Sequence, residues 1–165
     1  MGVGYYSVDK KYFSAQFSPG QPKHIFYFRS NRKFTMKQIS VVAAVIIHDH
    51  KILCVQRGPA KYDYISKKWE FPGGKLEEGE TKIEAIQREI KEELHMEINV
   101  DAFLITVNHT YPDFQLTMDT FLCSSETDEL TLTEHGDFKW LEKSELAGLD
   151  WAAADLPIVE RLLKD

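Results

Sequence analysis

Residues 69–98 read WEFPGGKLEEGETKIEAIQREIKEELHMEI, and they decide how the rest of the chain is organised. A loop rich in glycine and proline runs directly into a segment with helical periodicity. Thr81 followed by Glu84 predicts a capping box, in which each side chain satisfies a free backbone donor at the helix start. Four aliphatic residues at spacings of three and four predict a stripe that faces a core: Ile83, Ile86, Ile90 and Leu94.

A different face of this helix carries three carboxylates, Glu89, Glu92 and Glu93, at positions i, i+3 and i+4. Like charges at this spacing repel one another and destabilise a helix. One interpretation is an acidic, solvated helix surface. The alternative is a set of oxygen ligands for a hard divalent cation such as Mg²⁺, which prefers carboxylates and phosphate oxygens.

The spacing within residues 74–96 favours the metal interpretation, because it reads G-x5-E-x7-R-E-I-x-E-E-x-H-M. This segment resembles the signature of the Nudix hydrolases, G-x5-E-x7-R-E-U-x-E-E-x-G-U, where U is a bulky aliphatic residue. His95 is the single departure, since the family has glycine at this place. Glycine at the end of a helix normally supplies a left-handed residue, which histidine adopts only at some cost.

The resemblance implies an α+β fold, the Nudix α/β/α sandwich with a mixed β-sheet between helices. The β-branched and apolar runs agree with such a sheet, and a polar turn at 48–50 predicts that the first two strands form a hairpin. The expected strands are 39–47, 51–56, 98–107, 115–123 and 138–141, and the expected last helix is 158–163. The residues before Met36 do not resemble the family. The sequence therefore predicts an N-terminal extension, 1–35, of unknown role and a Nudix domain over 36–165.

The resemblance also assigns roles in the motif, and it implies Mg²⁺ as cofactor, with Mn²⁺ able to substitute. The metal ligands would be Glu89, Glu92 and Glu93 together with the carbonyl of Gly74. Arg88 would orient one of the carboxylates. One of the three Glu residues, or a Glu outside the helix, would act as the general base, and Glu89 is the candidate named here.

Several residues outside the carboxylate face have expected roles of their own. Gly73 would allow close backbone approach, and Glu80 would fix the loop. The guanidinium of Arg57 at a strand end and the ammonium of Lys75 would contact substrate phosphate, although a solvated strand end explains Arg57 equally well. Glu134 is a possible additional carboxylate.

The sequence on either side of the motif indicates which nucleotide is bound. The WEFPGGK run, 69–75, resembles the MutT-type enzymes, which convert nucleoside triphosphates to a monophosphate and pyrophosphate. Phe71 and Trp151 are candidates for stacking on the base. Asp155 departs from the asparagine of relatives that act on oxidised guanine nucleotides, and it agrees with relatives that act on cytidine nucleotides. The alternative is that Asp155 only caps the last helix, where Pro157 suits the first turn.

We therefore expect a cytoplasmic (deoxy)nucleoside triphosphate pyrophosphohydrolase, with 8-oxo-dGTP and dGTP pool sanitation, a DNA-repair role, as the leading function. The close alternative is the same chemistry on CTP, dCTP or 5-methyl-dCTP. A more distant alternative is a Nudix-fold nucleotide sensor without catalysis, with residues 1–35 as its interaction arm.

Composition limits the partners. A formal charge of −6 argues against binding of a nucleic-acid polymer. The chain has no run long and apolar enough for a membrane helix and no signal-peptide pattern. Cys54 and Cys123 are expected to be buried free thiols. A monomer or weak homodimer is expected.

Overall fold

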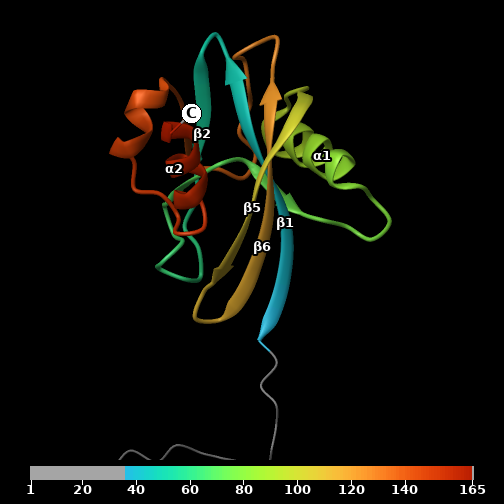
Figure 1. Cartoon of the computed structure of the whole chain (residues 1–165), viewed down its shortest axis with the longest axis vertical. Coiled ribbons are helices and arrows are strands. Elements are labelled where there is room, and N and C mark those ends of the chain that lie inside the picture. Colours follow the sequence, from blue (N-terminus) through green and yellow to red (C-terminus); the bar gives the residue numbers. More distant parts are fainter. Residues whose placement is uncertain (1–35, 165) are drawn as a thin grey trace, which may run out of the picture. The chain divides into compact units, whose positions relative to one another are not determined.

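The structure is a computed structural model that describes residues 36–164, so the expected extension, 1–35, lies outside the described residues. A mixed sheet separates two helices, with α1 on one side and α2 on the other (Figure 1). The strands are β1 (Lys37–His48), β2 (Lys51–Gln56), β3 (Trp69–Glu70), β4 (Gly73–Lys75), β5 (Asn99–Thr110), β6 (Phe114–Ser124) and β7 (Asp137–Leu141). The helices are α1 (Lys82–Leu94), the short 3₁₀ helix η1 (Lys143–Gly148) and α2 (Leu156–Lys164). The predicted α+β sandwich is confirmed.

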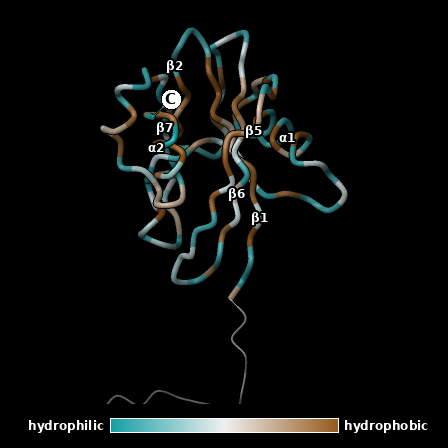
Figure 2. The backbone as a smooth tube through the Cα atoms, in the orientation of Figure 1, coloured by the Kyte–Doolittle hydropathy of each residue, from teal (hydrophilic) through white to brown (hydrophobic). Residues whose placement is uncertain are grey.

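β1 is the central strand of the sheet, whose order is β3-β2-β1-β6-β5. It pairs parallel with β6 and antiparallel with β2 and with β4, and β7 pairs with β2. Alternate residues of β1 face opposite clusters of the core: Ala43 and Val45 pack on the α2 side, whereas Val42 and Ile46 pack on the α1 side. A strand that is covered on both faces reads as a continuous apolar run. Figure 2 shows these hydrophobic stretches along the inner strands and the polar residues along the connections.

The turn between β1 and β2 is confirmed, and it has two residues. Asp49 and His50 adopt φ angles of 44° and 64°. Positive φ at both positions is the geometry that matches the twist of a tight hairpin, and Asp and other small polar residues tolerate it best.

The predicted capping box at the start of α1 is confirmed, and the structure shows how His95 ends the helix. Thr81 and Glu84 form the capping box, with side-chain-to-backbone bonds in both directions. At the other end His95 is left-handed, with φ 53° and ψ 31°, and its N–H donates to the carbonyl of Lys91. His95 therefore takes the left-handed conformation at the end of the helix that glycine would take in the family signature.

The predicted core stripe is wrong at one residue. Ile83 is 49% exposed, whereas Ile86, Ile90 and Leu94 are buried. Ile83 lies in the first turn of α1, at the margin of the face that packs on the sheet. Ala85 is fully buried instead.

Two short strands, β3 and β4, occupy a region that the sequence predicts to be loop. Strands of two and three residues are too short to show periodicity. β4 lies so close to β1 that a Cβ on Gly73, whose φ is 152°, would be 2.2 Å from the carbonyl oxygen of Val42. Gly73 thus allows the loop to enter the sheet beside β1.

Two further expectations have structural outcomes. Cys54 and Cys123 are confirmed as buried free cysteines. Within residues 36–164, neither helix has the length and apolar character needed to cross a membrane.

Candidate active site

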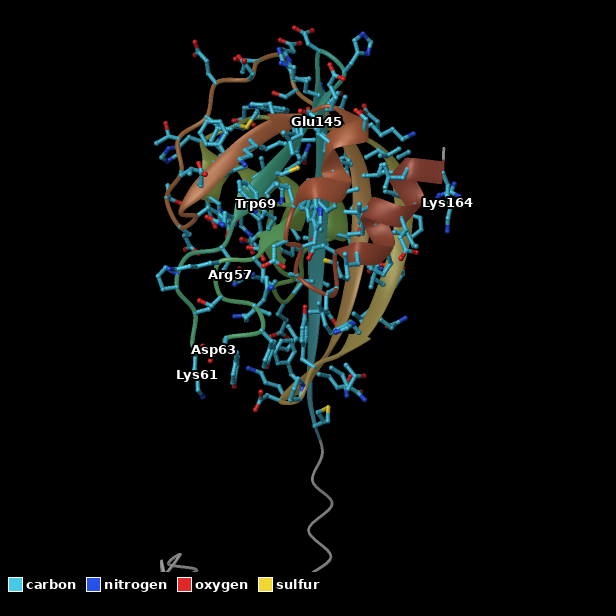
Figure 3. The ribbon with its side chains drawn as sticks, turned by 90° about the vertical axis from the view of Figure 1, so that its left-hand side faces the viewer. Arg57, Lys61, Asp63, Trp69, Glu145 and Lys164 are labelled. Atoms are coloured by element: carbon cyan, nitrogen blue, oxygen red, sulfur yellow. The ribbon has the colours of Figure 1, made fainter. Side chains whose placement is uncertain are left out.

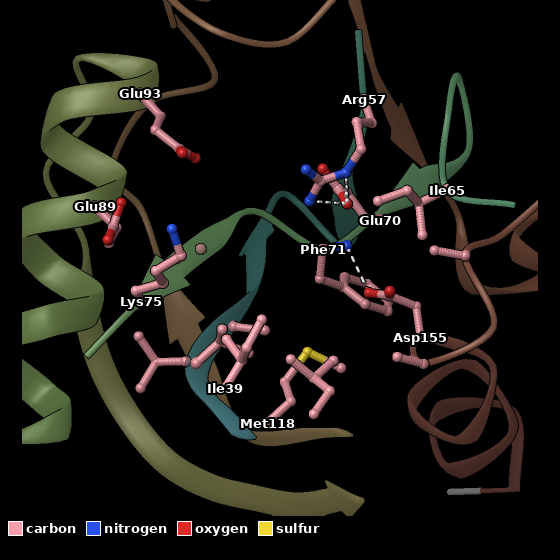
Figure 4. A pocket seen from close by; sticks show the side chains of 18 of the residues that line it. Ile39, Arg57, Ile65, Glu70, Phe71, Lys75, Glu89, Glu93, Met118 and Asp155 are labelled. Carbon is pink, nitrogen blue, oxygen red and sulfur yellow. Dashed lines mark hydrogen bonds and ion pairs between the residues drawn. The ribbon is translucent and has the colours of Figure 1, made fainter. Parts of the chain in front are cut away.

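A cavity of about 510 Å³ lies between α1, the central strands and the segment that leads into α2. Ligand sites commonly have this size. One end is acidic and is lined by Glu89, Glu92 and Glu93. The other end contains Phe71 and Asp155, and it is continued by apolar residues: Ile39, Ile65, Leu116 and Met118. Figure 4 shows Glu89 and Glu93 extending from the helix at one side and Phe71 and Asp155 at the opposite side.

Glu89 lies directly against the glycine loop. A Cβ built on Gly74 would be 2.2 Å from the carboxyl carbon of Glu89, so a side chain at position 74 would occupy the place of this carboxylate. Oε1 of Glu89 also lies 3.1 Å from Nη1 of Arg88, with which it forms an ion pair. The glycine therefore leaves room for a carboxylate beside the backbone of β4.

Arg88 ties the loop to the helix. Its Nε and Nη2 donate to the two oxygens of Glu80, at 3.0 and 2.7 Å, and Nη2 also donates to the carbonyl of Lys75. Glu80 in turn accepts from the N–H of Glu77. The hydrogen bond from Arg88 is the main cause that lowers the pKa of Glu80, and it raises the pKa of Arg88. This bidentate pair is suited to fixing the loop, the role expected for Glu80.

Glu93 extends from α1 into the cavity, and its side chain is 14% exposed, the same fraction as that of Glu89. Its Oε2 is buried without a hydrogen-bond partner. Burial is the main cause that raises the pKa of Glu93 to about 7, and the neighbouring Glu89 and Glu134 add to this rise, whereas His135 opposes it. An oxygen that is desolvated among like charges is stabilised by a cation.

Glu92 is placed differently, at the rim, where it is 63% exposed and 3.3 Å from Nη1 of Arg88. Among residues 36–164, no three acidic, histidine or cysteine side chains are grouped closely enough to enclose a metal ion. Glu89 and Glu92 lie instead against Arg88, at 3.1 and 3.3 Å from its Nη1. The donor set is nevertheless that of a hard divalent cation, and the unpartnered oxygen of Glu93 fits such an ion.

Arg57 begins the loop between β2 and β3, which carries Lys61 and Asp63 near its tip (Figure 3). Its Nε and Nη2 donate to Oε2 of Glu70 at 2.9 and 2.8 Å, and its side chain is 46% exposed. Both Arg57 and Lys75 line the cavity, where their charges face the acidic end (Figure 4).

Phe71 and Asp155 form the inner end of the cavity. The N–H of Phe71 donates to Oδ1 of Asp155 at 2.9 Å. The side chain of Asp155 therefore turns to the loop between β3 and β4, while its backbone carbonyl accepts the first helical bonds from Ile158 and Val159. Burial is the main cause that raises the pKa of Asp155 to about 8. The alternative of capping alone is not what the structure shows.

Trp151 lies behind Phe71 and is not one of the residues that line the cavity. The two rings stack with centroids 4.8 Å apart, and Nε1 of Trp151 donates to the carbonyl of Leu146 at 2.7 Å. A buried indole needs a partner for its N–H, and Leu146 supplies it away from the cavity. Trp151 thus supports the wall that Phe71 presents.

Comparison with known proteins explains this arrangement. A model of the NUDIX domain matches residues 41–161. The chain belongs to the Nudix family. It is therefore a Nudix hydrolase, an enzyme that acts on phosphoanhydride bonds, and Nudix hydrolases generally use divalent metal ions.

Individual relatives of this Nudix hydrolase carry two different names. A CTP pyrophosphohydrolase of Escherichia coli (strain K12) is 34% identical over 128 residues, covering 78% of this chain and 93% of that protein. An 8-oxo-dGTP diphosphatase of Proteus vulgaris is 37% identical over 95 residues, covering 58% of this chain and 84% of that protein. The solution structure of a DNA mismatch repair protein MutT, a Nudix hydrolase from methicillin-resistant Staphylococcus aureus 252, is 40% identical. It has a TM-score of 0.62 and covers 78% of this chain and 98% of that one.

The structure adds two polar residues at the candidate site for which the sequence suggests no role. Glu70 holds Arg57, and its Oε1 is 3.2 Å from Nε2 of His135. His135 follows Glu134, which lines the cavity as expected for a possible additional carboxylate. No sequence signal identifies Glu70 or His135, because β3 is too short for periodicity and position 135 lies outside the regular elements.

Proposed function

We propose that this Nudix hydrolase is a Mg²⁺-dependent nucleoside triphosphate pyrophosphohydrolase that acts on oxidised dGTP. The observation that supports this proposal most directly is the cavity itself, which joins an acidic face to an end lined by an aromatic ring, a carboxyl group and apolar residues. Glu89 and Glu93 suit a metal-bound triphosphate, and Phe71 and Asp155 suit a base. The name 8-oxo-dGTP diphosphatase, borne by several relatives, agrees with it.

Glu89, Glu92, Glu93 and the Gly74 carbonyl are the proposed holders of the metal. When bound, a divalent ion would neutralise the phosphate charge and make the attacking water more acidic. The chain's own residues bind and orient the substrate. Arg57 and Lys75 attract phosphate oxygens at the acidic end, where a polyphosphate would otherwise be repelled. Arg88 holds the loop and the helix in one arrangement.

The reaction adds water across one phosphoanhydride bond, so that the triphosphate yields a nucleoside monophosphate, pyrophosphate and one proton. A carboxylate is needed to take up that proton. Glu89 is the proposed base, since it lies in the cavity against Gly74 and keeps its contact with Arg88.

Asp155 is proposed to read the base. Burial raises its pKa to about 8, which favours the protonated carboxyl group near neutral pH. Its Oδ1 is occupied by the N–H of Phe71, and a protonated Oδ2 can donate a hydrogen bond. An oxidised guanine presents carbonyl oxygens to such a donor. Phe71, braced by Trp151, supplies an aromatic surface beside it.

A second candidate substrate is a cytidine nucleotide. One observation in its favour is Asp155 itself, in the Ala-Asp-Leu-Pro run. A second is the similarity to a CTP pyrophosphohydrolase over 93% of that protein's length. Cytosine offers both an amino donor and ring acceptors to a carboxyl group. The chemistry at the phosphate end would be the same.

A panel of triphosphates, each incubated with the enzyme and Mg²⁺, tests the proposal by pyrophosphate release. We expect the highest kcat/KM with 8-oxo-dGTP. A preference for CTP, dCTP or 5-methyl-dCTP would support the second candidate, and no turnover of any triphosphate would contradict both.

The variant Glu92→Gln separates an enzyme from a nucleotide sensor. Loss of one carboxylate charge should reduce hydrolysis by about 100-fold or more while the fold persists. Glu97→Gln, an exposed residue just beyond the same helix, is the control. Unchanged hydrolysis in Glu92→Gln would contradict its role as a metal ligand.

A further inference from the structure

We propose that His135 is a positioning residue that joins the metal side of the cavity to its phosphate side. The inference rests on the proposed function, since it takes Glu93 as a metal ligand and Arg57 as a phosphate contact. The side chain of His135 is 6% exposed and lies between two carboxylates. Nε2 is 3.2 Å from Oε1 of Glu70, and Nδ1 is 4.0 Å from Oε2 of Glu93.

The first contact fixes the imidazole ring. A carboxylate only accepts hydrogen bonds, so Nε2 carries the hydrogen that points to Glu70. Glu70 uses its other oxygen for Arg57, at 2.9 and 2.8 Å. Glu70 is therefore shared between His135 and Arg57, and an altered ring position would shift the carboxylate that orients the guanidinium.

The second contact concerns Glu93. Nδ1 of His135 and Oε2 of Glu93 face each other, and both are buried without a hydrogen-bond partner. Unpaired buried polar atoms are costly unless another group completes them. Because the ring hydrogen lies on Nε2, Nδ1 presents a lone pair to Oε2 of Glu93, so a cation rather than a hydrogen bond would satisfy this oxygen.

The segment that carries His135 is held from two directions. Thr133 donates from its N–H to the carbonyl of Glu93 at 2.9 Å, and its hydroxyl contacts the same carbonyl. Gly136 donates from its N–H to the carbonyl of Gln56, also at 2.9 Å. His135 is consequently fixed between the end of α1, which carries Glu93, and the end of β2, which Arg57 directly follows.

This arrangement is a buried chain of contacts from Glu93 through His135 and Glu70 to Arg57. Figure 4 shows Glu93 on one side of the cavity and the Arg57–Glu70 pair on the other. Residues behind metal ligands orient them, and their loss commonly weakens metal binding by 10- to 100-fold, roughly. We infer the same dependence for His135, with an added effect on substrate binding through Arg57.

Two variants separate the two contacts. His135→Phe keeps an aromatic ring and removes both nitrogens. His135→Gln keeps an amide N–H that can reach Glu70, and it removes the nitrogen that faces Glu93. His50→Asn is the matched control, because His50 is an exposed turn residue with φ 64°, a conformation that asparagine tolerates.

The first measurement is the binding of Mn²⁺ alone, followed by electron paramagnetic resonance of the free ion without any substrate. We expect about tenfold weaker binding for both His135 variants and no change for His50→Asn. This readout is independent of which triphosphate is hydrolysed, so a failure of the proposed substrate would leave it interpretable.

The second measurement is the KM for the triphosphate at saturating Mg²⁺. We expect a higher KM for His135→Phe and a KM close to that of the wild type for His135→Gln, which retains the contact to Glu70. Thermal unfolding shows whether each variant is folded. If His135→Phe is not folded, the measurements on His135→Gln test the proposal. Wild-type Mn²⁺ affinity in a folded His135 variant would overturn the proposal.

Discussion

Oδ1 of Asp155 accepts a hydrogen bond of 2.9 Å from the backbone N–H of Phe71, a residue 84 positions earlier in the chain. This bond ties the start of α2 to the loop between β3 and β4. The neighbouring contact between Phe71 and Trp151 reinforces the same junction. The inner end of the cavity is thus built from two distant segments.

The variant Asp155→Asn should remove a pH-dependent part of the stability. The pKa of Asp155 is raised from 3.8 to about 8, so folding favours the protonated acid. This stabilisation is complete below pH 3.8 and is lost as the pH rises through about 8. Relative to Asp155→Asn, the wild type should lose up to about 1.4 kcal/mol of unfolding free energy for each pH unit in this range.

Urea unfolding at several pH values between 5 and 9, roughly the window of this shift, measures the difference. Asp150→Asn is the matched control, because Asp150 is exposed and pairs with Lys68. Parallel stability curves for the wild type and Asp155→Asn would contradict a raised pKa.

The variant Gly74→Ala should separate activity from stability. The new Cβ would be 2.2 Å from the carboxyl carbon of Glu89, which must move. The carboxylate is the far end of a flexible side chain, so the melting temperature should change little. A displaced catalytic group costs about 100-fold in rate. Gly148→Ala, where no atom lies within 4 Å of the added carbon, should keep full activity. Equal kcat/KM values in both variants would contradict the close packing of Glu89 on the loop.

The variant His95→Gly should stabilise the protein, although it removes a side chain. His95 adopts φ 53°, which glycine adopts without the Cβ penalty. We expect a gain of about 0.5–1 kcal/mol in unfolding free energy. His109→Gly, near the end of β5, should have the opposite sign because a strand residue gains nothing from glycine. A loss of stability in His95→Gly would show that the histidine contributes more than its backbone conformation.

Divalent ions should raise the melting temperature through Glu93. A ligand that binds only the folded state stabilises it by mass action. Titration with Mg²⁺ or Mn²⁺ should therefore shift the melting curve upward in the wild type, and addition of a chelator should reverse the shift. Glu93→Gln should lose most of this shift, whereas Glu97→Gln should keep it. A full shift in Glu93→Gln would exclude Glu93 as a ligand.

Local sequence was sufficient for the elements that are set by near neighbours. Thr81 and Glu84 define the start of α1, and the β-branched run gives β1. The stripe of Ile86, Ile90 and Leu94 was predictable for the same reason. Ile83 was not, because its exposure depends on where the sheet ends beneath the first turn.

The sequence by itself determined the family and its chemistry, because the spacing of residues 74–96 places the carboxylates of α1 on one face. Only the tertiary structure decided which of them are buried: Glu92 is 63% exposed at the rim beside Arg88, whereas the side chains of Glu89 and Glu93 are each 14% exposed. It also decided that Glu70 and His135 meet. Contacts between residues 65 positions apart depend on how strands and loops pack, and no local pattern carries that information.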